Sequence, residues 1–130
     1  MMLVNIPEIV AEVRAAFDLY EKALVGNNTA TLDALFWDSE HTIRYGLAEN
    51  LYGIEAIRGF RTARLSSDLS RDLARTEITT FGRDAATAST LYRRRGSGKT
   101  ARQMQTWIRT PQGWRVVAAH VSFLDYDWPG

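Results

Sequence analysis

An arginine and a tyrosine, Arg44 and Tyr45, stand in the middle of the segment HTIRYG at residues 41–46. The segment alternates and is rich in residues that favour β-strands. Alternation puts Arg44 on one face of the strand and Tyr45 on the other, and six residues do not decide which face points inward. A buried guanidinium needs an anionic partner, because an unpaired buried charge is very costly. If Arg44 points inward, it therefore lines a pocket for a small acidic molecule; the alternative is a solvated arginine.

Further polar and aromatic side chains are candidates for the wall of the same pocket. Tyr20 follows Phe17 by one turn on the apolar face of a predicted helix, where its hydroxyl either finds a structural partner or donates to a ligand. In the strand TARQMQTWIRT, one face carries Gln103, Gln105 and Trp107. Two amides and an indole suit a pocket for a planar molecule, and a polar dimer face is an equally open interpretation.

Two other sets of residues give weaker signals. His120, on the last predicted strand, is more typical of a structural histidine than of a proton shuttle, and it stays a candidate substrate-binding residue together with Tyr45. Arg58, Arg61 and Arg64 recur every three residues on one predicted helix. That spacing is typical of a solvated face, although one of the three could guard the mouth of a pocket.

Composition and charge exclude several classes of function. The chain has 130 residues, no Cys and two His, so disulfides, thiol catalysis and thiolate metal sites are excluded, and we expect no metal or cofactor. Lys plus Arg number 16 and Asp plus Glu 15, so no net basic field indicates a nucleic-acid or membrane partner. The N-terminal stretch lacks a basic start and a long apolar run. We therefore expect no signal peptide, no transmembrane helix and a cytoplasmic location.

The elements that must position these residues form a single α+β domain over residues 1–130. Three hairpin connections join the last four predicted strands into an antiparallel meander. This order predicts a strongly curved, cone-shaped antiparallel sheet wrapped on the N-terminal helices, with an internal cavity. Periodicity predicts helices over 8–25, 29–37 and 54–65, a strand over 41–46, a turn and short return strand over 47–53, a loop over 66–72, and strands over 74–82, 85–94, 100–110 and 113–124.

The outer face of this sheet is also expected to be covered. The last predicted strand has apolar residues on both faces, among them Val116, Val117 and Ala118. We therefore expect a homodimer through the outer sheet face.

Two stretches, ENLYGIEAIRGFR and TARQMQTWIRTPQGWRVVAAHVS, resemble the cone-shaped nuclear-transport-factor-like superfamily. That superfamily includes ketosteroid isomerase, scytalone dehydratase, SnoaL-type cyclases and a kinase association domain, so the fold does not fix a function. The chain is more closely similar to AtzH-like and HpxZ-like bacterial proteins, which share LFW, HTIRYG, ENLYGI and RQMQTW in this order. AtzH-like proteins belong to cyanuric acid breakdown, and HpxZ-like proteins are associated with oxalurate breakdown.

The resemblance to AtzH-like proteins implies decarboxylation of 1,3-dicarboxyurea to allophanate without a cofactor, between two amidohydrolase steps. The catalytic tyrosine and arginine of that family correspond here to Tyr20 and Arg44. In such a reaction a fixed cation stabilises the charge that develops on the urea, and an acid protonates the nitrogen. We therefore expect Arg44 to supply the charge and Tyr20 the hydrogen bond or proton, while Gln105 and Trp107 position the planar substrate.

Other functions stay open from the sequence. The protein could act on another small ureido acid such as oxalurate, or it could bind a small acid without turnover as an assembly module. Isomerase or cyclase chemistry is disfavoured, because no inward Asp or Glu is evident on the strand of Arg44 to serve as a base.

Overall fold

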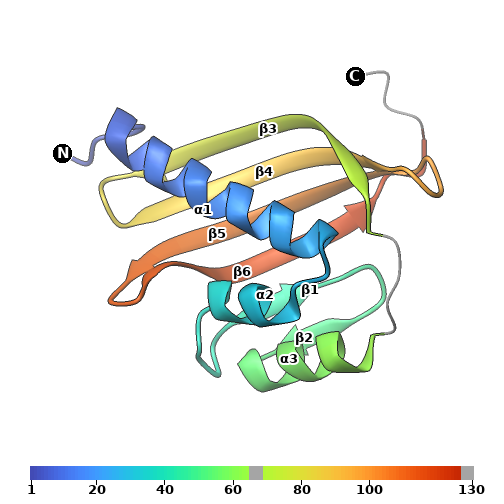
Figure 1. Ribbon diagram of the computed structural model, residues 1–130. Coiled ribbons are helices and arrows are strands. Elements are labelled where there is room, and N and C mark those ends of the chain that lie inside the picture. The colour runs from blue at the N-terminus through green and yellow to red at the C-terminus, as the bar shows by residue number, and fades with distance from the viewer. Residues whose placement is uncertain (65–68, 127–130) are drawn as a thin grey trace.

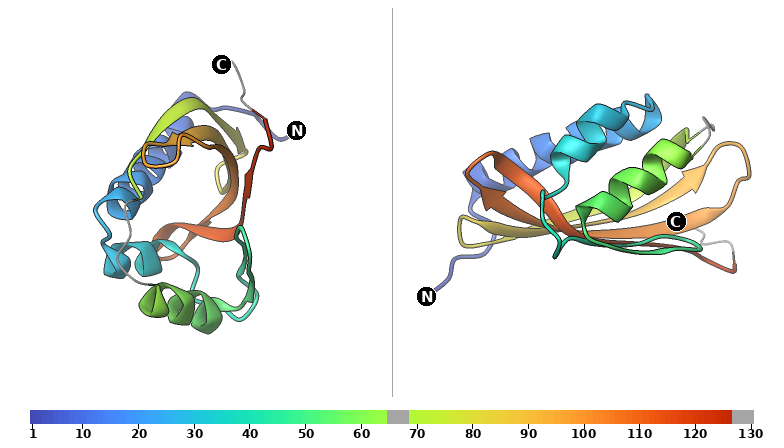
Figure 2. Two further views of the ribbon diagram at one scale, coloured as in Figure 1. Left: turned by 90° about the vertical axis from the view of Figure 1, so that its right-hand side faces the viewer. Right: turned by 90° about the horizontal axis from the view of Figure 1, so that it is seen from below.

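The computed structural model describes residues 1–64 and 69–126, and these ranges contain three helices and six strands. All three of these helices precede the four long strands, as expected for an α+β fold (Figure 1). The helices lie on one side of the sheet, which curves around them (Figure 2). In chain order the elements are α1 (Pro7–Val25), α2 (Thr29–Leu35), β1 (Ile43–Tyr45), β2 (Asn50–Tyr52), α3 (Ile54–Ala63), β3 (Arg71–Phe81), β4 (Ala85–Arg94), β5 (Thr100–Thr110) and β6 (Gly113–Phe123).

Helix α1 covers the middle of the sheet with one apolar stripe. It begins at Pro7, which lacks an N–H group and suits the first turn of a helix. Burying a large apolar side chain fully contributes roughly 1.5–3 kcal/mol, so the stripe holds the helix firmly on the sheet. This packing also fixes the position of Tyr20 near the end of the helix. The buried residues of α1 are Ile9, Val13, Phe17, Tyr20 and Ala23.

The sheet is mixed, with its strands in the order β2-β1-β6-β5-β4-β3. Strands β3 to β6 form the predicted antiparallel meander. Strand β1 departs from the expected antiparallel sheet because it runs parallel to β6. Most of the chain lies between these two strands, so no hairpin turn dictates their relative direction.

A β-bulge in β6 decides which of its side chains face inward. Val117 has no partner on β5, and the ladder shifts register at this point. The shift lets both Val116 and Ala119 point into the interior, where they are buried. Arg44 pairs with Ala119 in the parallel ladder, so its side chain also points to the interior.

Strand β3 begins earlier than its local sequence predicts. Arg71 already belongs to the strand, because it pairs with Arg94 of β4. The polar composition of the predicted loop over 66–72 does not reveal this pairing, which depends on a distant strand. Residues 66–68 of that loop lie outside the described residues.

Helix α3 starts at a glycine turn and is tied to α2. Gly53 precedes the helix with a φ of +88°, a conformation that favours glycine. A Cβ at this position would lie 3.3 Å from the carbonyl oxygen of Glu40. Arg61 of α3 forms an ion pair with Asp33 of α2 at 2.6 Å. These contacts fix the direction of α3, whose last turn leads to Arg64.

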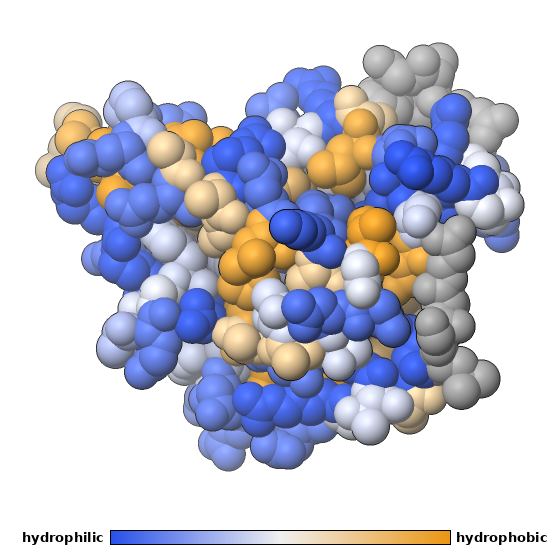
Figure 3. Space-filling model, in the orientation of Figure 1, coloured by the Kyte–Doolittle hydropathy of each residue, from blue (hydrophilic) through white to orange (hydrophobic). Residues whose placement is uncertain are grey.

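One apolar core joins the helices to the sheet, and a smaller cluster of Tyr92, Ala101 and Val121 is separate from it. The face that carries the helices is mostly hydrophilic, with apolar areas in its middle (Figure 3). Within the described ranges, no helix is both long enough and apolar enough to cross a membrane.

Candidate functional site

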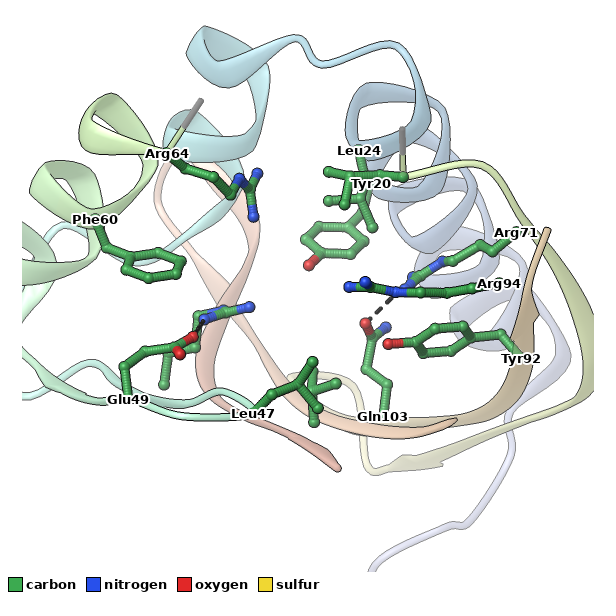
Figure 4. Close-up of a pocket in the computed structure, with 13 residues that line it drawn as sticks. Tyr20, Leu24, Leu47, Glu49, Phe60, Arg64, Arg71, Tyr92, Arg94 and Gln103 are labelled. Carbon is green, nitrogen blue, oxygen red and sulfur yellow. Dashed lines mark hydrogen bonds and ion pairs between the residues drawn. The ribbon is translucent and has the colours of Figure 1, made fainter. Parts of the chain in front are cut away.

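A cavity of about 260 Å³ lies where the end of α1 and the end of α3 face the inner side of the sheet. This volume is just below the roughly 300–1,000 Å³ of typical ligand sites, so the cavity suits a small metabolite. Figure 4 shows polar and aromatic side chains from these elements directed toward one space. The polar lining residues are Arg44, Arg64, Arg71, Arg94, Glu49, Tyr20, Tyr92 and Gln103.

Arg44 reaches the cavity from β1 as one half of an ion pair. Its Nη1 donates to Glu49 Oε1 at 2.8 Å, and the two side chains are 15% and 22% exposed. The guanidinium also lies 5.6 Å from the centre of the Phe60 ring, within the range of a cation–π contact. A guanidinium has five N–H donors, so Arg44 keeps donors for a ligand after it has paired with Glu49.

Arg71 is held more tightly and shapes the opposite wall. Its Nε donates to Glu21 Oε2 at 3.1 Å, and its Nη2 donates to the other oxygen of the same carboxylate. Nη2 also donates to Gln103 Oε1 at 3.2 Å, and the guanidinium lies 3.9 Å from the centre of the Tyr92 ring. Burial lowers the pKa of Arg71, but the hydrogen bond and charge of Glu21 outweigh burial, and the pKa lies above its ordinary value. Arg71 therefore aligns Gln103 and Tyr92 on the cavity wall.

Two cavity arginines, Arg64 and Arg94, form no ion pair with a carboxylate among the described residues. Arg64 Nη2 is buried and has no hydrogen-bond partner in the described parts of the chain, and its guanidinium lies 5.9 Å from the centre of the Phe60 ring. Burial lowers the pKa of Arg64, and the charges of Arg44 and Arg61 lower it further. An anion in the cavity would offset this repulsion and give Nη2 an acceptor.

The cavity is therefore net cationic and also offers neutral donors. The two carboxylates described above each offset one guanidinium, and no carboxylate of the described ranges offsets Arg64 or Arg94. Tyr20 directs its hydroxyl into the space between the two walls (Figure 4). Gln103 adds an amide nitrogen, Nε2, that is buried and has no partner among the described residues. Such a site can bind a small planar dianion and donate hydrogen bonds to its oxygens.

Three of the residues predicted from sequence line the cavity, namely Tyr20, Arg44 and Gln103. Gln105 and Trp107 lie on the same inner face of β5 as Gln103, in agreement with the predicted alternation, but they do not line the cavity. Trp107 Nε1 donates to Gln105 Oε1 at 3.1 Å, and the indole is fully buried. Trp107 is thus part of the core and not a lid over the ligand space.

Tyr45 and His120 lie on the outer face of the sheet, away from the cavity. Tyr45 follows the inward Arg44 and so points the other way, and the bulge in β6 directs His120 outward beside it. The two rings meet edge-on with their centres 5.7 Å apart. The Tyr45 hydroxyl lies 3.0 Å from that of Tyr52. Neither Tyr45 nor His120 reaches a ligand in the cavity.

The three arginines at this spacing do not all form a solvated face. Arg61 is buried, whereas the Arg58 side chain is partly exposed. The alternative, that one of the three lies at a pocket, agrees with the position of Arg64, which lines the cavity. A signal for this placement was present, because Ile54, Ile57, Arg61 and Arg64 continue one stripe at helical spacing. The two isoleucines are buried, so the stripe carries both arginines toward the interior.

The sequence analysis also did not predict three other cavity residues, Glu49, Arg71 and Arg94. Glu49 lies in the turn before β2, Arg71 lies in a predicted loop, and Arg94 ends a strand. Each is a polar residue at a position that local patterns predict to be exposed. They meet at one cavity because the sheet curves and the turn folds back over it.

A model of the AtzH-like family matches residues 2–127. The chain belongs to the AtzH-like family. This confirms the resemblance inferred from the four short motifs. No curated protein matches the sequence.

Similar solved structures confirm the curved α+β fold of this AtzH-like protein. A protein of unknown function from Pectobacterium atrosepticum is 58% identical with a TM-score of 0.93, and the match covers 96% of this chain and 100% of that one. A cystatin-like fold protein from Burkholderia xenovorans is 49% identical with a TM-score of 0.92, over 98% of this chain and 100% of that one. An NTF2-like protein of unknown function from Pseudomonas putida shares the fold alone, at 17% identity and a TM-score of 0.78, over 94% and 90% of the two chains.

Proposed function

We propose that this AtzH-like protein decarboxylates 1,3-dicarboxyurea to allophanate without a cofactor, with Tyr20 and Arg44 as catalytic residues. The observation that carries the proposal is the excess of guanidinium groups around a small cavity that also holds a tyrosine hydroxyl. 1,3-Dicarboxyurea is a small planar dianion, with a carboxylate at each end and a carbonyl group in the middle. Its charge and shape suit this lining.

The reaction breaks one bond between a urea nitrogen and a carboxylate carbon. The carboxylate leaves as neutral CO2, and the bonding electron pair stays on the nitrogen, where it is delocalised onto the urea carbonyl oxygen. One proton then adds to that nitrogen. The dianion and the proton together give CO2 and the allophanate monoanion. A catalyst therefore needs positive charge or hydrogen-bond donors at the carbonyl oxygen and a source of one proton.

The side chains of the cavity support these roles. Arg44 supplies a fixed charge and free N–H donors for the carbonyl oxygen, and Tyr20 donates a hydrogen bond or the proton. Arg64 and Arg94 hold the carboxylates of the substrate, because both lack a carboxylate partner among the described residues. Donors that are already in place at a developing charge lower the barrier without reorganisation, and loss of one typically costs about 100- to 1,000-fold in kcat.

The charge of the cavity favours dicarboxyurea over oxalurate, which carries a single carboxylate and would leave one cation unmatched. Isomerase chemistry gains little from the carboxylate that does line the cavity. Glu49 is paired with Arg44 at 2.8 Å and is therefore poorly placed to take a proton from carbon. A protein that only binds a small acid would saturate with dicarboxyurea and leave its rate of decay unchanged.

Rates on the two ureido acids test the proposal. Dicarboxyurea is labile, so it has to be generated in the assay by an upstream amidohydrolase, which also tests the proposed functional coupling between the two enzymes. We expect accelerated CO2 release from dicarboxyurea, no turnover of oxalurate, and a loss of about 100-fold in kcat for Tyr20→Phe. Turnover of oxalurate alone would shift the function to purine-derived ureido acids, and wild-type turnover by Tyr20→Phe would remove Tyr20 from the mechanism.

A further inference from the structure

The carboxylate of Glu49 is bound to the guanidinium of Arg44, which the proposed mechanism uses. One of its oxygens accepts from Arg44 Nη1 at 2.8 Å, and the other accepts from the backbone N–H of Ala48 at 3.1 Å. The side chain thus folds back over its own turn, and both oxygens are held. Only 22% of the Glu49 side chain is exposed, so the pair is protected from water at the cavity wall.

A glycine makes room for this arrangement. A Cβ at Gly46 would overlap the Glu49 carboxylate and would lie 2.9 Å from Arg44 Nη1. The backbone of the same turn is closed by a hydrogen bond from the N–H of Gly46 to the carbonyl oxygen of Glu49 at 2.9 Å. The absence of a side chain at position 46 is therefore what allows the carboxylate to sit against Arg44.

We propose that Glu49 is a positioning residue that keeps the carboxylates of a bound dianion away from Arg44 and leaves the remaining donors of Arg44 for the carbonyl oxygen. This inference rests on the proposed function, because its purpose is set by decarboxylation. A cation clamped onto the departing carboxylate stabilises the bound substrate more than the transition state, since that carboxylate becomes neutral CO2. Binding energy of this kind tightens the complex without raising the rate. An internal carboxylate on Arg44 prevents such a clamp.

If Glu49 has this role, its loss should strengthen the binding of a dianion and slow its turnover. Removal of the Glu49 charge gives the cavity another cation for a ligand, so a dianion binds more tightly. The same change lets the substrate carboxylate engage Arg44, so the chemical step slows. A residue with a purely structural role would instead weaken binding and turnover together.

The experiment compares Glu49→Gln and Gly46→Ala with the wild-type protein by calorimetric titration with glutarate and by CO2 release from dicarboxyurea. Glutarate is a stable dianion with as many atoms between its carboxylates as dicarboxyurea has. Glu55→Gln is the matched control for charge, since Glu55 is an exposed residue that pairs with Arg58 at 3.4 Å. Gly59→Ala is the matched control for the glycine, because a Cβ there meets no atom within 4 Å.

We expect glutarate to bind Glu49→Gln about 3- to 10-fold more tightly than the wild-type protein, while kcat falls by about 10-fold or more. Gly46→Ala should shift both quantities in the same directions, and both controls should behave like the wild type. Unchanged or weaker glutarate binding by folded Glu49→Gln would overturn the inference, as would tighter binding with unchanged kcat. The glutarate titration does not depend on turnover. If the wild-type protein does not accelerate CO2 release, the decarboxylase proposal fails separately, and the titration still decides whether Glu49 withholds Arg44 from anions.

Discussion

Replacement of Arg64 by Gln is expected to weaken ligand binding without loss of stability. Arg64 Nη2 is buried and finds no hydrogen-bond partner within residues 1–64 and 69–126, so we expect the ligand-free protein to carry the cost of a desolvated donor. A bound anion offsets this cost by pairing with the guanidinium. Arg64→Gln should therefore lower the affinity for an anion, while the stability of the ligand-free protein should rise or stay unchanged.

The size of the effect follows from the charge and burial of Arg64. Two unit charges 4 Å apart interact by about 4 kcal/mol at an effective dielectric constant of about 20, which is an upper limit for a partly exposed group. Hydrogen bonds to charged groups contribute about 1.5–3 kcal/mol in practice. At about 1.4 kcal/mol per factor of ten, the variant should bind a dianion roughly 10- to 100-fold more weakly. Removal of an unsatisfied donor is worth about 1 kcal/mol, so the melting temperature should stay constant or rise by about 2–5 °C.

Calorimetric titration with glutarate and thermal melts in the absence of ligand measure the two quantities. Arg58→Gln is the matched control on the preceding helix α3, because the Arg58 side chain is 37% exposed and pairs with Asp38 and Glu55 outside the cavity. The control should keep wild-type affinity. Wild-type affinity in Arg64→Gln, or a parallel loss of affinity and melting temperature, would refute the assignment of Arg64 to ligand binding.

Three further predictions concern the framework of the site. Gly53→Ala should lower the free energy of unfolding in urea by about 1–2 kcal/mol, because φ at this residue is +88°, and an unchanged midpoint would contradict this. The hydrogen bond from Trp114 lowers the pKa of Glu12 below its usual 4.5. Ionised Glu12 therefore stabilises the fold when the pH is above its unfolded-state pKa, and this contribution is lost as the pH falls through its folded-state pKa. Melts from about pH 5 to pH 3 should therefore show a smaller loss of stability in Glu12→Gln than in the wild type, and parallel curves would argue against it. We also propose that the outer face of the sheet pairs two copies of the chain, because Met104 on that face is 58% exposed. Sedimentation should give roughly twice the 14.7 kDa chain mass for the wild type and the mass of a monomer for Met104→Asp. A wild-type monomer at all concentrations would exclude the pairing.

The elements that depend on local patterns were predictable from the sequence. The apolar stripe of α1 placed Tyr20 on the buried face, and strand alternation placed Gln103 on the same face of β5 as Gln105 and Trp107. The proposed catalytic roles of Tyr20 and Arg44 came from the resemblance to AtzH-like proteins, not from these patterns. Periodicity alone did not distinguish Gln103, which lines the cavity, from Trp107, which packs in the core.

The rest of the site depends on contacts between distant parts of the chain. The inward direction of Arg44 follows from the parallel pairing of β1 with β6, and the outward direction of His120 follows from the bulge at Val117. Arg71 and its partner Glu21 are 50 residues apart. No local pattern in the sequence indicates a bulge, a parallel partner strand or an ion pair of this kind. The structure was therefore needed to identify these features.

The release of CO2 from freshly generated 1,3-dicarboxyurea, followed in the presence of the wild-type protein and of Arg44→Ala, tests the central claim most directly. The rate has to be compared with uncatalysed decay, and Arg58→Gln serves as a control that removes one positive charge outside the cavity. The account predicts a clear acceleration by the wild type and by Arg58→Gln that Arg44→Ala reduces by about 100-fold or more. No acceleration by the wild type, or an equal acceleration by Arg44→Ala, would contradict it.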